Sequence, residues 1–403
     1  MSSPGSPPPS PSQATETTEH VPGAENVPGP ESGLRNAQGP TLVDRDLHPV
    51  DVEELRTRVH RTIDEFLDRQ ERILADMTED CLPMIEAVRD LMRGGKRLRP
   101  AFCYWGWRAA GGQECPEAVR AATSMEFFQA AALIHDDVMD DSDTRRGLPA
   151  VHRRFAERHR LLEWSGQSDR FGLAGAVLTG DLCLAWSEEL FSTSGLSPQA
   201  LERGRKVFDR MRTELMAGQY LDMLEQAGAE NLAGDPVRRA QRVLKYKSAK
   251  YTIEHPLLIG ARLAGADDAT AAALSAFGLP LGEAFQLRDD LLGVFGNPAC
   301  TGKPAGDDLR EGKRTVLIAL TLRLARPDRA AVLRSRLGEA DLDPRGVAEL
   351  QEIITESGAV DRVESMITEL TDRSCLALDR APVDGQALPV LRSLVDVATV
   401  RRF

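Results

Sequence analysis

An acidic cluster lies inside an apolar stretch of the sequence, in the segment AAALIHDDVMDDSDTRRG. At the pitch of an α-helix, Asp136 and Asp140 fall one turn apart on the same face, whereas Asp137 points about 100° away. Such carboxylates are costly to bury unless a cation or a hydrogen-bond donor meets them. The spacing therefore predicts a helix that binds Mg²⁺, which takes one or two protein carboxylates and completes its shell with water and phosphate. A solvated acidic face is the alternative.

A second acidic pair, Asp289 and Asp290 in FQLRDDLLGVFGN, lies in another apolar stretch. Two such pairs suggest that one polyanion is held between them. Basic groups that suit phosphate accompany these pairs: Lys96, Arg97 and Arg99 in GGKRLRP, Arg145 and Arg146 after the first acidic motif, Lys247 beside Ser248, and Lys303 and Lys313 after the second pair. Each basic element is ambiguous alone, and together they indicate two bound polyanions.

Composition narrows the class of protein. The 403 residues are 42% hydrophobic and 5% aromatic, and the abundance of Ala, Leu, Arg and Glu favours an all-α fold. A formal net charge of −12 opposes general binding to nucleic acid or to anionic membranes. The sequence has neither a secretory signal pattern nor an uncharged apolar run of about 18 residues, so we expect a cytoplasmic protein without a membrane span.

The chain divides into a tail and a helical part. Residues 1–45 are rich in Pro, Ser, Gly, Thr and Glu, which predicts a disordered tail. From Asp51 onward, apolar residues recur at helical spacing, as at Val52, Leu55 and Val59. Since glycine and proline punctuate the later segments without an obvious linker, residues 46–403 are predicted to form one helical domain.

Together these motifs resemble those of the trans-polyprenyl diphosphate synthases. Five motifs occur in the family order, and the resemblance runs from about Asp51 to the C-terminus: GGKRLRP, HDDVMDDSDTRRG, YKSAKYTIEHP, FQLRDDLLGVFG and GKPAGDDLREGK. The resemblance implies an isoprenoid synthase-type helical bundle around a central cavity, usually as a homodimer. It also implies Mg²⁺-dependent condensation of isopentenyl diphosphate with allylic diphosphates such as dimethylallyl, geranyl and farnesyl diphosphate.

The resemblance assigns roles to particular residues. Asp136 and Asp140 would bind two Mg²⁺ with support from Asp137, and Asp289, assisted by Asp290, would bind a third. Contacts to isopentenyl diphosphate are implied for Lys96, Arg99, Gln129 and Arg146; contacts to the allylic diphosphate for Arg145, Lys247, Lys303 and Lys313; and places at the reacting centre for Ser248 and Gln286. Two positions depart from the family pattern, namely Gln129 where some members have His and Gly293 where many have a third Asp. We interpret both as variation that preserves activity.

Product length is predicted from residues one and two turns before Asp136, since each helical turn adds about 5 Å of depth, close to one isoprene unit. Ala131 and Ala132 are small and leave room, whereas Phe127 and Phe128 would close the floor a turn lower. This pattern predicts a twenty-carbon product, geranylgeranyl diphosphate. The alternatives are a farnesyl or longer polyprenyl diphosphate synthase, a terpene cyclase that shares the first acidic motif, and a non-catalytic subunit of a prenyltransferase complex.

Overall fold

The computed structural model describes residues 48–228, 231–296, 306–339 and 341–400. The predicted tail, residues 1–45, and the predicted phosphate ligand Lys303 lie outside these ranges. All described residues belong to one compact unit, which spans Val43–Phe403.

The described part of the chain is helical, as predicted. Its longer helices are α1 (Leu55–Met77), α2 (Leu82–Met92), α3 (Leu98–Ala109), α4 (Pro116–Met139), α5 (Val151–Leu161), α6 (Ser168–Ser192), α7 (Pro198–Gly228), α8 (Pro236–Val243), α9 (His255–Ala264), α10 (Asp268–Phe295), α13 (Val316–Leu324), α14 (Pro327–Arg336), α15 (Pro344–Glu356), α16 (Ala359–Arg380) and α17 (Ala387–Thr399). Short helical turns are η1 (Val52–Glu54), η2 (Glu79–Cys81) and α12 (Asp307–Arg310). Strands β1 (Thr144–Arg145) and β2 (Leu148–Pro149) form a small antiparallel hairpin, which the sequence analysis did not predict.

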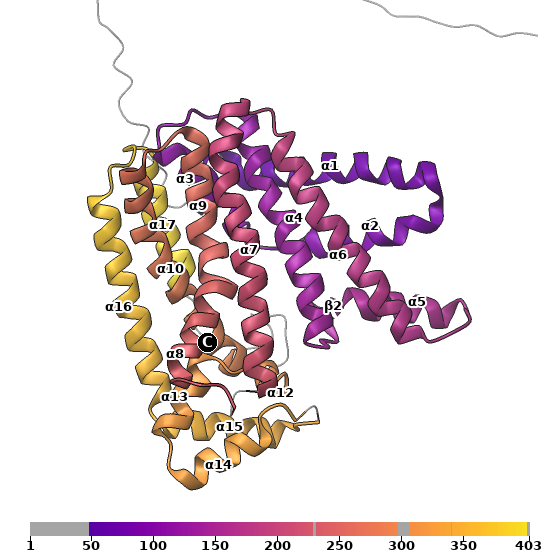
Figure 1. Ribbon diagram of the computed structural model, residues 1–403, viewed down its shortest axis with the longest axis vertical. Helices are drawn as coiled ribbons and strands as arrows, with labels where there is room; N and C mark the ends of the chain where they lie inside the picture. Colours follow the sequence, from indigo (N-terminus) through magenta and orange to yellow (C-terminus); the bar gives the residue numbers. More distant parts are fainter. Residues whose placement is uncertain (1–47, 229–230, 297–305, 340, 401–403) are drawn as a thin grey trace, which may run out of the picture. The chain divides into compact units, whose positions relative to one another are not determined.

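Helix α10 joins two apolar cores. Its first half, including Leu274 and Phe277, packs in a large core with residues of α1, α3, α4, α6, α9 and α17. Its second half, including Leu287 and Leu291, packs in a smaller core with α8, α13, α15 and α16. Helices α4, α6, α7, α9 and α10 run roughly side by side (Figure 1). Burial of these apolar faces holds the acidic ends of α4 and α10 in place.

The segment η3 (Leu244–Glu254) is a π-helix, a form that is rare and often occurs at functional sites. Two glycines let it approach its neighbours closely. A Cβ at Gly218 of α7 would lie 2.4 Å from the backbone nitrogen of Lys247, and a Cβ at Gly282 of α10 would lie 2.4 Å from the carbonyl oxygen of Ala249. Any larger residue at either position would push η3 away, so the glycines set the depth of Lys247 between α7 and α10.

None of the helices in the described ranges is long and apolar enough to cross a membrane.

Candidate active site

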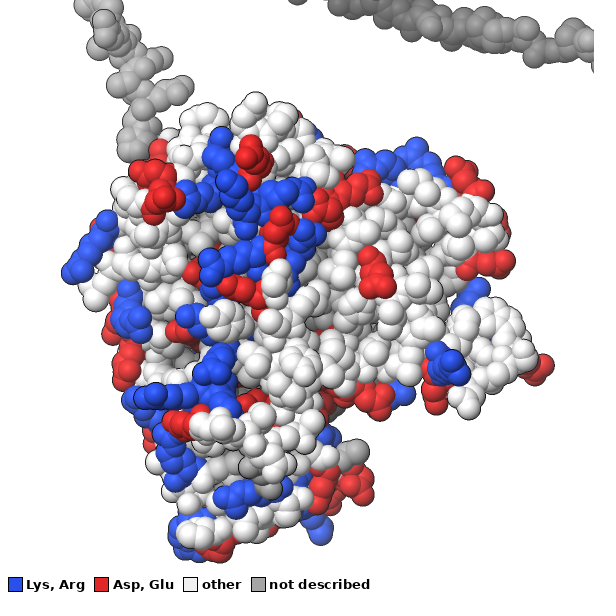
Figure 2. All heavy atoms as spheres, viewed as in Figure 1, with Lys and Arg blue, Asp and Glu red and all other residues white. Residues whose placement is uncertain are grey.

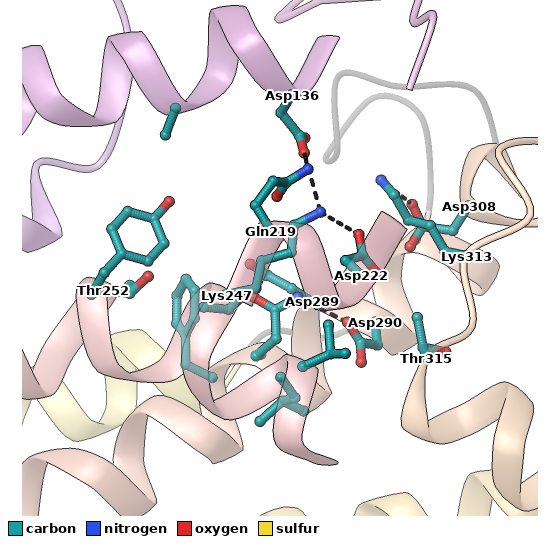
Figure 3. Close-up of a pocket in the computed structure, with 18 of the residues that line it drawn as sticks. Asp136, Gln219, Asp222, Lys247, Thr252, Asp289, Asp290, Asp308, Lys313 and Thr315 are labelled. Atoms are coloured by element: carbon teal, nitrogen blue, oxygen red, sulfur yellow. Dashed lines mark hydrogen bonds and ion pairs between the residues drawn. The ribbon is translucent and has the colours of Figure 1, made fainter. Parts of the chain in front are cut away.

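A cavity of about 700 Å³ lies between α4, α7, η3, α10 and the segment around α12. Two groups of polar residues line it (Figure 3). The first, called here the acid–lysine cluster, comprises Asp136, Gln219, Asp222, Lys247, Asp289, Asp290, Asp308 and Lys313. The second, called here the basic cluster, comprises Lys96, Arg99, Gln129, Tyr251 and Thr252. Apolar side chains such as Leu133, Leu215 and Phe285 complete the wall.

Asp136 projects from the last turn of α4 into the cavity. Its Oδ1 accepts hydrogen bonds from Lys247 Nζ at 3.1 Å and from Gln219 Nε2 at 3.0 Å. Lys247 also donates to Asp222 Oδ2 at 2.6 Å, so its ammonium bridges α4 and α7 (Figure 3). Burial opposes ionisation of Asp136, but the charges of Lys247, Lys313 and Arg145 outweigh it and lower the pKa of Asp136.

Asp140, which caps α4, meets Lys313 from the segment after α12. Oδ2 of Asp140 lies 3.5 Å from Lys313 Nζ, which also approaches Asp308 at 3.4 Å and Glu311 at 2.5 Å. Burial and the negative charge of Asp136 raise the pKa of Asp140 to about 6. The same Oδ2 is buried without a hydrogen-bond partner among the described residues. A carboxylate of this kind is suited to a cation, which would stabilise its ionised form.

Asp137 points away from the cavity, as its helical position predicts. Its side chain is 2% exposed, and Oδ1 accepts a hydrogen bond from Arg145 Nε at 2.8 Å and a second from Arg145 Nη2. Arg145 itself lines the cavity and lies 3.6 Å from Asp136. The burial of Arg145 opposes its charge, but Asp137 and Asp136 outweigh that effect and raise its pKa. Asp137 therefore holds a permanently charged guanidinium at the rim of the acid–lysine cluster.

The second acidic pair faces the cavity from α10. Asp289 and Asp290 both line it, and Gln286 Nε2 donates to Asp290 Oδ1 at 2.8 Å. Burial raises the pKa of Asp290 to about 8, with the charge of Asp308 acting in the same direction. Asp308 also explains the departure at Gly293, because a Cβ there would lie 1.9 Å from Asp308 Oδ2. The space beside Gly293 thus already contains a carboxylate, which comes from α12.

The basic cluster lies along α3, α4 and η3. Arg99 Nη2 donates to Thr252 Oγ1 at 2.8 Å, and its guanidinium lies over the ring of Tyr251, 4.3 Å from the centroid. Tyr251 in turn donates from its hydroxyl to Gln129 Oε1 at 2.6 Å. Lys96 lines the same part of the cavity. These side chains present donors to an anion at a distance from the acidic residues.

The remaining predicted ligands occupy different places. Ser248 and Gln286 line the cavity, as the resemblance implies. Arg146 is not among the described residues that line the cavity, because it donates to the carbonyl oxygens of Leu91 at 2.6 Å and Gly94 at 2.9 Å. Its contact is with the loop that carries Lys96, so in this conformation it supports that loop.

The predicted chain-length residues divide into two groups. Ala132 lines the cavity, whereas Ala131, Phe127 and Phe128 are fully buried and are not among the described lining residues. Phe128 packs edge-on against the lining residue Tyr251, with ring centroids 6.3 Å apart. Phe127 packs elsewhere, against Phe66 at 4.8 Å and Trp186 at 6.3 Å. Of the two phenylalanines, Phe128 is therefore the one that packs against a residue of the cavity wall.

The donor set fits Mg²⁺ that shares its coordination with a substrate. Within the described ranges, no three Asp, Glu, His or Cys side chains are close enough to hold a metal by themselves. Instead, carboxylates of α4 and α10 line one cavity, and Oδ2 of Asp140 makes no hydrogen bond among the described residues, with Lys313 Nζ 3.5 Å away. Mg²⁺ is commonly bound by one or two carboxylates together with substrate phosphate.

Sequence reasoning missed several residues of the site. Gln219 and Asp222 belong to the segment GQYLDM, and their spacing of three places both on one helical face directly after Gly218. That combination of a glycine with two polar residues in an amphipathic helix is a usable signal. Tyr251 and Asp308 carried weaker signals, since an aromatic residue in a basic segment and an acid in a loop are common.

Comparison with known proteins shows the family. The profile of the family described as Polyprenyl synthetase matches residues 83–354. The chain is 32% identical to a geranylfarnesyl diphosphate synthase of Aeropyrum pernix over 314 residues, which cover 76% of this chain and 91% of that protein. It is 30% identical to a geranylgeranyl diphosphate synthase of Sulfolobus acidocaldarius, with 77% and 87% of the two chains covered.

A solved structure supports the same relationship. The geranylgeranyl pyrophosphate synthase of Corynebacterium glutamicum, solved with isoprenyl diphosphate and magnesium, is 40% identical and superposes with a TM-score of 0.82. The match covers 88% of this chain and 100% of the Corynebacterium chain. The chain therefore belongs to the polyprenyl synthetase family and is a prenyl diphosphate synthase, a transferase of prenyl groups.

Proposed function

We propose that the protein condenses isopentenyl diphosphate with allylic diphosphates in the presence of Mg²⁺ and that its main product is geranylgeranyl diphosphate. One observation carries the proposal, namely a single cavity in which the acid–lysine cluster and the basic cluster are both present beside an apolar wall. The two clusters offer separate sites for two diphosphates, and the apolar residues offer a site for the hydrocarbon chain.

The acid–lysine cluster would bind the allylic diphosphate. Asp136, Asp140 and Asp289 would hold Mg²⁺, about three ions per site, and bound Mg²⁺ would neutralise charge on the departing diphosphate. Lys247, Lys313 and Arg145 would donate to the same diphosphate and so favour cleavage of the allylic C–O bond.

The basic cluster would bind isopentenyl diphosphate through Lys96, Arg99 and Gln129. Its double bond attacks the allylic cation and forms the new C–C bond. The proton that is then lost would go to the released diphosphate.

Product analysis tests the reaction. Purified protein, Mg²⁺ and isopentenyl diphosphate are incubated with dimethylallyl, geranyl or farnesyl diphosphate, and the dephosphorylated products are sized by mass spectrometry. We expect mainly a twenty-carbon alcohol. A main product of fifteen carbons, or one much longer than twenty, would support the proposed reaction and contradict the proposed product length. No Mg²⁺-dependent product from any primer would instead support a non-catalytic subunit.

Two matched variants test the proposed floor of the cavity. Phe128→Ala should lengthen the product, since Phe128 stands behind the lining residue Tyr251. Phe127→Ala should leave the length unchanged and reduce the stability by ~3–5 kcal/mol, because Phe127 packs in the core. Equal product lengths for Phe128→Ala and the parent protein would reject this floor.

A homodimer is part of the proposal. Large apolar side chains are exposed on α6 and α7: Phe171, Leu173, Val177, Leu178, Met216, Tyr220 and Met223. Figure 2 shows an area with few charged side chains below the charged upper part of these helices. A second copy would cover this surface. Light scattering should give the mass of a dimer, and Leu178→Glu with Tyr220→Glu should give that of a monomer.

The cytoplasmic location stays a prediction.

A further inference from the structure

A buried ion pair joins the loop that carries Lys96 to the helix that carries Asp136. Arg97 is 3% exposed, and its guanidinium donates to the carboxylate of Glu126, which is 7% exposed and lies on α4. A second nitrogen of the same guanidinium donates to the carbonyl oxygen of Met92, at the end of α2. Arg97 therefore links α2, α4 and the start of α3 through one side chain.

The backbone at Arg97 has a conformation that disfavours a side chain. Its φ of 54° lies in the left-handed region, which is unfavourable for residues other than glycine. Its neighbours Lys96 and Arg99 line the cavity, whereas Arg97 turns into the core. A glycine would adopt this backbone at less cost, so the interactions of the guanidinium must compensate for the conformation.

A second arginine, Arg146, contacts the same loop. Arg146 donates to the carbonyl oxygens of Leu91 and Gly94, and its guanidinium lies 3.2 Å from where a Cβ at Gly95 would be. Gly95 has a φ of 117°, which leaves the space to the guanidinium. Two arginines thus fix the loop, and Arg97 supplies the ion pair with α4.

We propose that Arg97 and Glu126 form a positioning pair that keeps Lys96 and Arg99 in register with Asp136. Glu126 precedes Asp136 by ten residues on the same helix, and Gln129 of the basic cluster lies one turn after Glu126. Fixing the loop to this helix sets the separation between the two diphosphate sites. The inference rests on the proposed function, since it concerns the site assigned to isopentenyl diphosphate.

The test replaces both charges together, because one buried charge left alone would destabilise the fold. In Arg97→Met with Glu126→Met, apolar side chains of similar length fill the same space without directional hydrogen bonds. We expect the KM for isopentenyl diphosphate to rise about 10-fold or more, since small displacements of a substrate are costly in rate. The KM for the allylic diphosphate should change less than about twofold, because the acid–lysine cluster is unaltered.

Two further variants separate positioning from other effects. Arg97→Gly with Glu126→Met relieves the left-handed backbone but still removes the pair, so it should show the same rise in KM. Arg239→Met with Glu225→Met removes another ion pair with little exposure, 11% and 8%, and should leave the KM for isopentenyl diphosphate unchanged.

Each outcome bears on the inference. Normal kinetics in a folded Arg97→Met, Glu126→Met protein, or restored kinetics in the glycine variant, would overturn it. If the parent protein itself transferred no prenyl group, the proposed function would fail first, and the two failures are therefore distinguishable. Hydrogen exchange at residues 93–97 supplies a readout independent of activity, and we expect faster exchange in both Arg97 variants and parent-like exchange in the Arg239 variant.

Discussion

The two polar clusters of the cavity differ in the partners of their charged side chains. In the acid–lysine cluster, charged side chains satisfy one another, as Lys247 does for Asp136 and Asp222. In the basic cluster, Arg99 instead rests on neutral groups, namely the hydroxyl of Thr252 and the ring of Tyr251. Under the proposed function, the first cluster would exchange its partners when a diphosphate and a cation enter, whereas Arg99 would keep its own. Substitutions and pH should therefore affect the first cluster more strongly.

The largest effect is expected at Asp136. Asp136→Asn removes a carboxylate that contacts Lys247 and that we propose as a cation ligand, so kcat should fall about 10²–10³-fold. Steady-state rates at saturating substrates and Mg²⁺ measure this loss. Asp222→Asn is the matched control, since Asp222 contacts Lys247 and Gln226 but is not a proposed cation ligand, and its loss should cost about 10-fold. Equal losses in the two variants would argue against the proposed cation ligand.

The next effect is a dependence on pH in metal-free protein. Burial raises the pKa of Asp140 from 3.8 to about 6, which corresponds to ~3 kcal/mol between its protonation states. Protonated Asp140 therefore contributes to the free energy of unfolding. Because the folded pKa lies above the unfolded value, this contribution is present at pH below 4 and is lost as the pH rises through 6.

Chemical unfolding of the parent protein and of Asp140→Asn at several pH values isolates the contribution of Asp140. The stability of the variant relative to the parent should increase between pH 4 and pH 7, and added Mg²⁺ with diphosphate should reduce the difference. A difference that does not change with pH would contradict the assignment.

A smaller effect is expected where α10 meets α12. Gly293→Asp places a Cβ in the space of the Asp308 carboxylate, so Asp308 must move. The Mg²⁺ concentration for half-maximal activity should rise about 10-fold, as is usual when groups that orient metal ligands are displaced. Adding Asp308→Gly transfers the carboxylate from α12 to α10 and should reverse most of the rise. Isothermal titration of Mg²⁺ in the presence of diphosphate should follow the same order.

The smallest effect belongs to the basic cluster. Tyr251→Phe removes the hydrogen bond to Gln129, worth ~1 kcal/mol, and should raise the KM for isopentenyl diphosphate about fivefold. The dependence on Mg²⁺ should not change, since Tyr251 lies outside the acid–lysine cluster. A changed Mg²⁺ dependence in Tyr251→Phe would show that the two clusters are not independent.

Local spacing in the sequence predicted where helices form better than it predicted which face of each helix is turned toward the cavity. The spacing of Leu55, Val59 and Ile63 predicted α1, and all three are buried. The spacing of Asp136 and Asp140 predicted that both lie on one side of α4, where they meet Lys247 and Lys313 respectively. Periodicity is local, so a single segment is sufficient to reveal it.

Other features depend on contacts between distant segments and could not be predicted in this way. Which of Phe127 and Phe128 stands behind the cavity depends on how α4 is rotated against η3. The role of Asp308 depends on the return of α12 to Gly293, and that of Arg97 on a carboxylate 29 residues away. Pairings of this kind are set by tertiary packing rather than by local spacing.

The π-helical form of η3 determines how this segment responds to the deletion of a residue. A π-helix bonds each residue to the fifth one along the chain, so an α-helix covering the same span requires fewer residues. Deleting one residue within Leu244–Glu254 would let one turn of the segment revert to α-helical bonding, so the residues after it would keep their orientation. Gly260 of α9, whose Cβ would lie 1.7 Å from the carbonyl oxygen of Cys103, would then still face α3. The segment should therefore accept the loss of one residue more readily than an ordinary α-helix, in which the same deletion would turn everything after it by about 100°.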